Sequence, residues 1–413
     1  MLRPVIGYIL FLAMALYIRQ KKGYSDWKII LIGIISQIIV AFAILNLPFI
    51  ISFFEYLANG ILKMRDATLE GTKFAFGYIG GGDSPFEIKE NCSTFVFAFQ
   101  ALPNIILTAA MSAILAYFKV LPFLAKGIGY VFKWLFRIRE SISMLAAAKI
   151  FLGQCEAPLL IRSDLEFLRR SEIFIMLALA FSTASVSVMP IYADCIKNIC
   201  PDAMQHIIMS SIMGVISTLL VCSIIIPNEE SEISNQSIKS QNSGYNGFIE
   251  AMSKGVSDGA FIWWCIVGSL IGTVALLSII NYILATLPNW GGSSVTLQRI
   301  FGIFMYPFAW LLGVQSADIQ TIAQILGTKL AINETIAFFD LAKSHVSHDS
   351  VTRTIYAIMN FGNFATIGIT VGAMRALIPS QTQAISQLIW KAFFAGFIAV
   401  GLSSSIMSIF LRY

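Results

Sequence analysis

The stretch GQCEAPLL, residues 153–160, decides how this chain folds, because it sets an amide, a thiol and a carboxylate side by side in an apolar region. Residues 143–148 before it read SMLAAA, and the chain after it stays apolar only as far as Ile161. Each flank is too short to cross a membrane, which takes about 20 apolar residues. The pattern predicts a re-entrant hairpin, with two helical arms of roughly ten residues and about 15 Å that meet at a polar tip. Glu156 would then lie near the membrane midplane, and Pro158 would begin the second arm.

The composition places the whole chain in a membrane. Of its 413 residues, 57% are hydrophobic and 12% are charged, and the mean hydropathy is +0.77. A soluble protein has about twice that charged share. The sequence therefore predicts an all-α polytopic membrane protein. The net charge of +5 does not indicate nucleic acid binding, because the basic residues lie in loops beside predicted spans.

The cysteines and histidines suggest neither a metal site nor a cofactor. The six cysteines have no zinc or redox spacing, and the pair Cys195 and Cys200 forms no motif. His206, His345 and His348 lie at the ends of predicted spans or in loops, where we expect them to be solvated. We assign them no proton relay, and we expect no metal and no cofactor.

Eight apolar segments are predicted to be transmembrane helices. They cover residues 4–18, 27–49, 93–118, 173–192, 207–226, 260–284, 356–377 and 385–411. The first has no small-residue cleavage site after it, so we interpret it as a retained span and not as a signal peptide. Three further segments are predicted to contain interfacial amphipathic helices, in residues 51–90, 120–138 and 297–314. The hydrophilic residues 228–246 are predicted to form a linker between two halves.

The second half repeats the pattern of the first. Residues 323–342 form an apolar run that is broken at Asn333 and Glu334, again an amide beside a carboxylate. Glu156 and Ser185 are 29 residues apart (185 − 156), as are Glu334 and Asn363 (363 − 334). Each half thus contains a hairpin with a polar tip, followed by a span with a polar centre. Such duplicated, discontinuous helices predict an inverted repeat and a secondary transporter with its site at the midplane.

Basic loops set the predicted orientation. Residues 19–28, 126–139 and 162–170 contain clustered Lys and Arg and fall on one side, which the positive-inside rule makes cytoplasmic. Both termini then lie outside the cytoplasm, and the two hairpins enter the membrane from opposite faces.

The tip carboxylates Glu156 and Glu334 are candidate ligand-binding groups. An acidic side chain at bilayer depth costs about 2.5–3.5 kcal/mol on the insertion scale, so it faces a cavity or a partner. Amides at 154, 333 and 363 both donate and accept hydrogen bonds, which suits a nucleobase edge or a ribose diol. Since no Arg or His cluster is present to hold an anion, we expect a small, neutral, polar ligand. The alternative is that the carboxylates only cap broken helices.

Two further interpretations stay open on the residues alone. The hydroxyls of STASVS, residues 182–187, either face the hairpin tip or bond to carbonyls one turn back in their own helix. Glu156 and Glu334 would also suit a membrane-embedded enzyme as an acid and base pair. The absence of a metal-ligand cluster and of an activated nucleophile argues against an enzyme.

Four segments resemble the concentrative nucleoside transporter family. GQCEAPL at 153–159 is similar to its G-Q-x-E-A-P-L motif, and GTKLAINE at 327–334 is similar to G-x-K-x-x-x-N-E. FGNFATIG at 361–368 is similar to G-F-A-N-F-S-S-I-G, and PFAWLLGV at 307–314 also matches. The resemblance covers essentially the whole chain and implies nucleoside import across a bacterial inner membrane.

The resemblance also implies an assembly, a mechanism and a site. It implies a homotrimer with an elevator mechanism, in which residues 1–140 are largely scaffold. The transport domain would comprise 141–205 and 297–377, and residues 206–296 and 378–413 would supply the remaining spans. Gln154, Cys155, Glu156 and Val188 would face the nucleobase, Glu334, Asn363 and Thr366 would hold the ribose, and Asn333 and Phe361 would lie in the same site.

This chain departs from the family pattern where sodium-coupled members bind their ion. Lys149 stands where those members have Asn, in the region that also includes Leu152, Thr183 and Ala184. A lysine ammonium could occupy the cation site itself, which argues against sodium coupling. Burial makes a lysine easier to deprotonate, so proton coupling is a second possibility. The third is that Lys149 extends to the cytoplasmic membrane surface and has no coupling role.

Substrate preference stays open. Cys155 replaces the Thr or Ser of many members, Asn360 replaces a Gly, and residues 182–187 depart from S-I-A-G. Another small neutral polar solute and a sodium-coupled nucleoside symporter remain the alternative functions.

Overall fold

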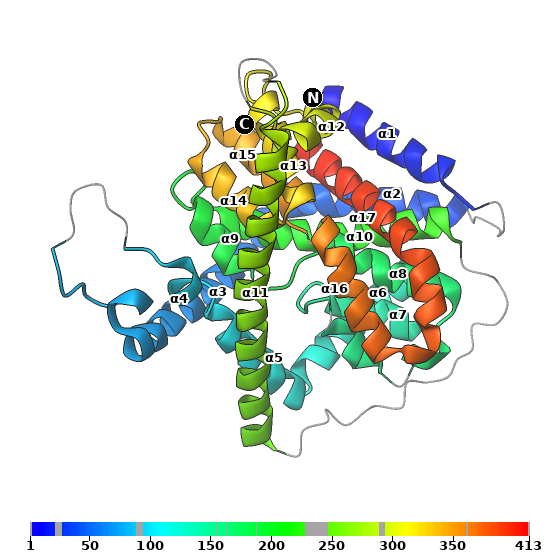
Figure 1. Ribbon diagram of the computed structural model, residues 1–413. Helices are drawn as coiled ribbons and strands as arrows, with labels where there is room; N and C mark the ends of the chain where they lie inside the picture. The colour runs from blue at the N-terminus through cyan, green and yellow to red at the C-terminus, as the bar shows by residue number, and fades with distance from the viewer. Residues whose placement is uncertain are drawn as a thin grey trace.

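The computed structural model describes residues 2–20, 27–87, 94–154, 156–162, 164–186, 188–227, 247–288, 294–360 and 362–411. Within these ranges the chain forms helices and no strand (Figure 1). The predicted all-α class is confirmed.

Among the described residues, five segments are long and apolar enough to cross a membrane. They are α2 (Trp27–Asn46), Phe97–Tyr117, α10 (Ala203–Ile225), α11 (Phe248–Leu284) and Pro379–Phe410. The second consists of α4 (Phe97–Gln100) and α5 (Asn104–Tyr117), and the last of η4 (Pro379–Gln381) and α17 (Thr382–Phe410). These segments overlap five of the eight predicted spans. The first predicted span forms α1 (Leu2–Tyr17), which is apolar but has only 16 residues.

The segment predicted to hold an interfacial helix and a loop forms a longer helix than expected. α3 (Pro48–Phe76) extends over 29 residues and is followed by η1 (Gly77–Gly80). Pro48 lies in the first turn of α3, where its missing N–H would have no intrahelical partner in any case. The second predicted span therefore ends at Asn46 and not at Phe49. The other two predicted interfacial segments form α6 (Val120–Phe136) and α12 (Leu297–Leu311).

Two predicted spans are broken at polar residues. The first break lies within the predicted span 173–192, whereas the second lies close to the start of the predicted span 356–377, because the helix before it begins at His348. One consists of α8 (Arg170–Ser182) and α9 (Met189–Ile196). The other consists of α15 (His348–Ile358) and α16 (Phe364–Leu377). Each break frees backbone N–H and C=O groups from their helical partners, so it needs other protein groups around it at membrane depth.

The two tips differ in the elements that follow them. α7 (Glu140–Ala148) precedes the first tip, and the chain after it forms the short 3₁₀ turns η2 (Ala157–Ile161) and η3 (Leu165–Phe167). The prediction of a ten-residue α-helical second arm is wrong, since the chain after the tip forms only these two short 3₁₀ turns. The second tip joins two α-helices, α13 (Ile319–Ala331) and α14 (Glu334–Lys343).

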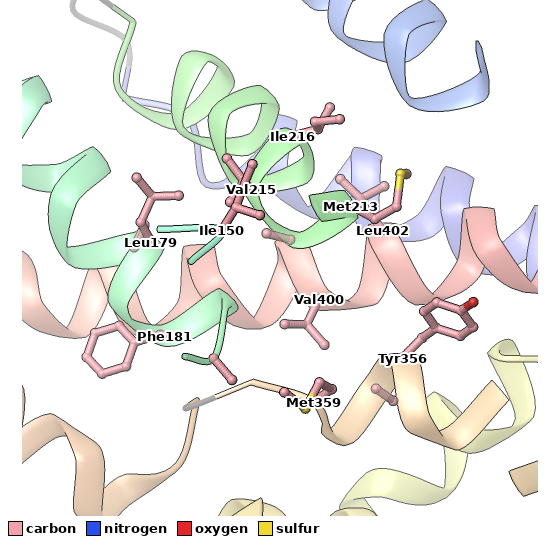
Figure 2. Close-up of a cluster of buried hydrophobic side chains, with 14 of the residues drawn as sticks. Ile150, Leu179, Phe181, Met213, Val215, Ile216, Tyr356, Met359, Val400 and Leu402 are labelled. Carbon is pink, nitrogen blue, oxygen red and sulfur yellow. The ribbon is translucent and has the colours of Figure 1, made fainter. Parts of the chain in front are cut away.

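The core lies where α8, α10, α15 and α17 pack together (Figure 2). Buried side chains of these helices include Phe181, Met213, Tyr356 and Val400. All residues of α8 from Ser171 to Ser182 are buried, as expected for a helix enclosed by other helices. Gly396 of α17 permits the close approach, because a Cβ there would lie 2.8 Å from the Phe181 Cβ.

In contrast, α11 packs on α5 and leaves most of its surface exposed. Gly255 and Gly259 form a G-x-x-x-G pattern, and a Cβ at either position would lie 2.7 Å from a backbone atom of α5. Small residues at this spacing allow two helix backbones to approach closely. Large apolar side chains are exposed elsewhere on α11, among them Phe261, Trp264 and Ile271.

Lys329 of α13 holds the break between α15 and α16 in place. Its Nζ donates hydrogen bonds to Asn360 Oδ1 at 2.5 Å and to the Gly362 carbonyl at 2.7 Å. Gly362 has no room for a side chain, since a Cβ would lie 2.9 Å from the Phe181 carbonyl oxygen and 3.1 Å from Asn360 Oδ1. Lys329 can therefore bond to both Asn360 and Gly362 only because residue 362 has no side chain to displace the Asn360 amide.

We predict that Gly362→Ala lowers stability by about 1–3 kcal/mol, the usual cost of adding a methyl group to a packed interior. The closest atom is the Phe181 carbonyl oxygen, a backbone group of a buried helix that cannot easily move aside. The measurement is the midpoint of thermal unfolding in detergent. An unchanged midpoint for Gly362→Ala would contradict the packing described here.

Candidate functional site

Glu334 lies where the two broken spans meet. Its Oε1 accepts a hydrogen bond from the Tyr192 hydroxyl at 2.8 Å, and its Oε2 accepts one from Asn363 Nδ2 at 3.1 Å. Tyr192 belongs to α9 and Asn363 precedes α16, so the carboxylate joins the second tip to both breaks. The Tyr192 ring stacks on Phe338 of α14 with centroids 4.7 Å apart, which fixes the direction of its hydroxyl.

Two site amides also cap helices, which sets their orientation. Asn363 Oδ1 accepts hydrogen bonds at 2.9 Å from both the backbone N–H and the hydroxyl of Thr366. Asn333 Oδ1 accepts one from the Ile336 N–H at 3.0 Å. Asn is a preferred N-cap residue because its oxygen satisfies an otherwise unpaired N–H group of the first turn. The cap turns the Asn363 NH₂ group toward Glu334, as their hydrogen bond shows.

The first tip contacts α16 through Gln154. Thr370 donates its hydroxyl hydrogen to Gln154 Oε1 at 3.3 Å, across 216 residues of sequence. The Glu156 carboxylate folds back on its own tip, where Oε2 accepts a hydrogen bond from the Gly153 N–H at 3.1 Å. Residues of the first tip and of the second broken span thus lie in one region. Cys155 and Phe361, also predicted for the site, lie outside the described residues.

The break between α8 and α9 packs against the first tip. The Val186 N–H donates to the Phe151 carbonyl at 3.4 Å. Thr183 donates its hydroxyl to the Leu179 carbonyl at 2.9 Å, so this hydroxyl bonds back to its own helix. Val188 is the N-cap residue of α9, four residues before Tyr192, so this predicted site residue lies at the start of the helix that contacts Glu334. Leu152 and Ala184 are buried beside the break.

Lys149 is buried at the end of α7. Its exposed fraction is 2%, so the possibility that it extends to the membrane surface is wrong. Its charge interacts with that of Glu156 across the tip. A lysine side chain is therefore buried inside the protein in the region predicted to contain the ion site.

Three residues near the site were not identified from the sequence. Tyr192, Lys329 and Thr370 are separated from their partners by 142, 31 and 216 residues. Lys329 lies within the GTKLAINE motif and could have been identified as a site residue from that motif. Nothing in the sequence indicates that Tyr192 contacts Glu334. Lys329 and Asn360 also border a small cavity that none of Glu156, Glu334 and Asn363 lines.

Three family models match successive parts of the chain. Residues 6–79 and 206–408 match the N-terminus and C-terminus of the Na+ dependent nucleoside transporter family. Residues 98–198 match a model described as nucleoside recognition.

Similar curated proteins are transporters. The chain is 29% identical to the uncharacterized transporter YutK of Bacillus subtilis, over 98% of both chains. It is 27% identical to the putative nucleoside permease NupX of Escherichia coli, over 99% of both chains. It is 25% identical to the nucleoside permease NupC of Helicobacter pylori, over 98% of this chain and 97% of the relative.

Similar solved structures include CNTnw in several states. An inward-facing, substrate-bound structure of CNTnw has a TM-score of 0.89 at 25% identity and covers 99% of this chain and 97% of its own. A variant of CNTnw in an outward-facing state has a TM-score of 0.86 at 25% identity, with the same coverage. The family models, the curated relatives and these structures agree with the four motifs, and the chain therefore belongs to the concentrative nucleoside transporter family, as a membrane transporter and not an enzyme.

Proposed function

We propose that this protein is a secondary active transporter that imports nucleosides across a bacterial inner membrane. The observation that carries the proposal is the position of Glu334, a buried carboxylate held by Tyr192 and Asn363 at the junction of two broken helices. Its oxygens can accept hydrogen bonds from a ribose diol. A neutral sugar needs no cationic partner, in keeping with the amides and carboxylates that surround the site.

The remaining predicted residues would bind the two parts of a nucleoside. Asn363 and Thr366 would hold the ribose together with Glu334, and their cap geometry supports a fixed orientation. Gln154, Cys155, Glu156 and Val188 would face the base, with Asn333 and Phe361 completing the pocket. The Gln154–Thr370 hydrogen bond supports one site shared by both halves.

We further infer an inverted repeat, with the two hairpins re-entrant from opposite faces. In Figure 1, α12 and α13 lie near the start of α1 at the top of the view, whereas α6 and α7 lie lower in the molecule. The hydrogen bond from Arg3 Nη1 to the Val314 carbonyl, at 3.3 Å, supports the first of these positions. Arg353 donates to the Ser408 carbonyl at 2.8 Å, which supports a C-terminus at that same end, outside the cytoplasm.

The mechanism would be an elevator movement of the transport domain, comprising residues 141–205 and 297–377. Inward-facing, intermediate and outward-facing states are known for CNTnw. Residues 1–140 would be largely the scaffold, through which the chain would form a homotrimer.

Sodium would not drive this transporter. The buried Lys149 ammonium would occupy the cation site, and import would be proton-coupled or uncoupled. Lys149, Leu152, Thr183 and Ala184 would form this coupling region.

We predict that Glu334→Gln lowers uridine uptake into proteoliposomes by about 10- to 150-fold, as expected when a hydrogen bond to a charged group worth about 1.5–3 kcal/mol is lost. Glu55→Gln, at an exposed position of α3, is the matched control and should transport normally. Equal uptake by both variants would rule out Glu334 as a substrate ligand.

Tyr192→Phe removes only the hydroxyl that orients the Glu334 carboxylate. We expect a rise in KM for uridine of roughly 2- to 12-fold, corresponding to about 0.5–1.5 kcal/mol. Tyr282→Phe on the exposed surface of α11 controls for the substitution itself. A KM equal to that of the native protein would mean that Tyr192 does not orient the site.

Uptake under separately imposed ion gradients tests the role of Lys149. We predict that a sodium gradient does not stimulate the native protein and that Lys149→Asn gains sodium-stimulated uptake. Strong sodium stimulation of the native protein would contradict the assignment of Lys149 to the cation site.

A further inference from the structure

A cluster of metal-ligand residues lies outside the nucleoside site, at the turn that joins α9 to α10. Cys200 and Asp202 belong to this turn, and His348 is the first residue of α15. The Cys200 Sγ, an Asp202 carboxylate oxygen and a His348 ring nitrogen all lie within 4.8 Å of one another. The cluster cannot be recognised in the sequence, because His348 lies 146 residues after Asp202 (348 − 202).

This set of donors fits a first-row transition metal. Thiolate, imidazole and carboxylate are the ligands that Zn²⁺ uses in proteins, and three of them leave a fourth position for water. With the usual bond lengths, tetrahedral zinc holds its ligand atoms about 3.3–3.8 Å apart, which small side-chain rotations would reach. Cys200 is buried, whereas Asp202 and His348 are exposed, so an ion can enter from the aqueous side.

Hydrogen bonds from neighbouring groups orient two of the ligands. His348 Nδ1 lies 3.1 Å from the Ile199 carbonyl, which can only accept, so the neutral ring has its N–H at Nδ1 and its lone pair at Nε2. His206 Nε2 lies 3.1 Å from Asp202 Oδ2 and leaves Oδ1 on the side of the Cys200 thiol, 3.2 Å away. Outer partners of this kind accompany most metal-binding histidines and carboxylates.

His206 also connects the cluster to α15. The expectation that it is solvated is wrong, since it is buried and its Nδ1 lies 2.8 Å from the Tyr356 hydroxyl. Tyr356 precedes the break at Asn360 by one turn of α15. An ion at the cluster would therefore tie the α9–α10 turn to the helix that leads into the nucleoside site.

We propose that Cys200, Asp202 and His348 bind one divalent first-row transition-metal ion, with Zn²⁺ as the best fit. The ion forms bonds to the thiolate sulfur, a carboxylate oxygen and the imidazole nitrogen, and the thiol proton leaves to solvent. The bound ion stabilises the folded protein, since it binds three groups that come together only in the native state.

The test uses the purified full-length protein in detergent, stripped with a chelator and titrated with Co²⁺ as a spectroscopic probe. We expect a thiolate-to-cobalt charge-transfer absorption that saturates at one ion per chain and is displaced by Zn²⁺. Zn²⁺ should also raise the midpoint of thermal unfolding. No charge-transfer absorption in the native protein would overturn the proposal.

Variants distinguish the proposed site from adventitious binding. Cys200→Ser should abolish the absorption, and His348→Ala should weaken Co²⁺ binding at least tenfold. Cys265→Ser, which removes an exposed thiol of α11, and His345→Ala are the matched controls and should bind as the native protein does. Absorption that persists in Cys200→Ser, or that disappears in Cys265→Ser, would contradict the assignment. Because His348 is exposed, His348→Ala tests the site even if the buried Cys200 does not tolerate substitution.

Discussion

A carboxylate buried within a membrane protein must receive hydrogen bonds that replace those it has lost from water, and the arrangement around Glu334 depends on this requirement. One donor comes from Tyr192 of α9 and the other from Asn363 at the start of α16. Both donors belong to spans that are broken, and an unbroken helix would not present the Asn363 cap to the carboxylate. The breaks and the site therefore depend on the same hydrogen bonds.

A buried lysine accompanies each tip. Lys329 interacts with the charge of Glu334 and anchors the broken backbone at Asn360 and Gly362. Lys149 interacts with the charge of Glu156 at the other tip. Unpaired charges are costly at this depth, so each lysine helps to keep a carboxylate inside the protein. The two lysines differ in their relation to the family motifs. Lys329 lies in GTKLAINE, which resembles G-x-K-x-x-x-N-E, whereas Lys149 departs from the Asn that the resemblance implies for sodium-coupled members.

The breaks could be predicted from the sequence because a polar side chain inside an apolar span must face a cavity or bond to other protein groups, and such positions are typical of interrupted helices. Asn333 and Asn363 are two such polar residues, and each is the N-cap of a helix. The second arm of the first hairpin could not be predicted, since local sequence does not distinguish an α-helix from 3₁₀ turns after Pro158. Tyr192 and the cluster of Cys200, Asp202 and His348 could not be found either, because their partners become neighbours only when distant helices pack together.

We propose that both halves of the chain bind one nucleoside at the junction of the broken helices. The most direct measurement is an experimental structure of the protein with uridine bound. We expect the ribose hydroxyls within hydrogen-bond distance of Glu334 and Asn363 and the base beside Gln154 and Glu156. Uridine bound elsewhere, with the Tyr192–Glu334–Asn363 hydrogen bonds unchanged and no contact to either tip, would contradict it.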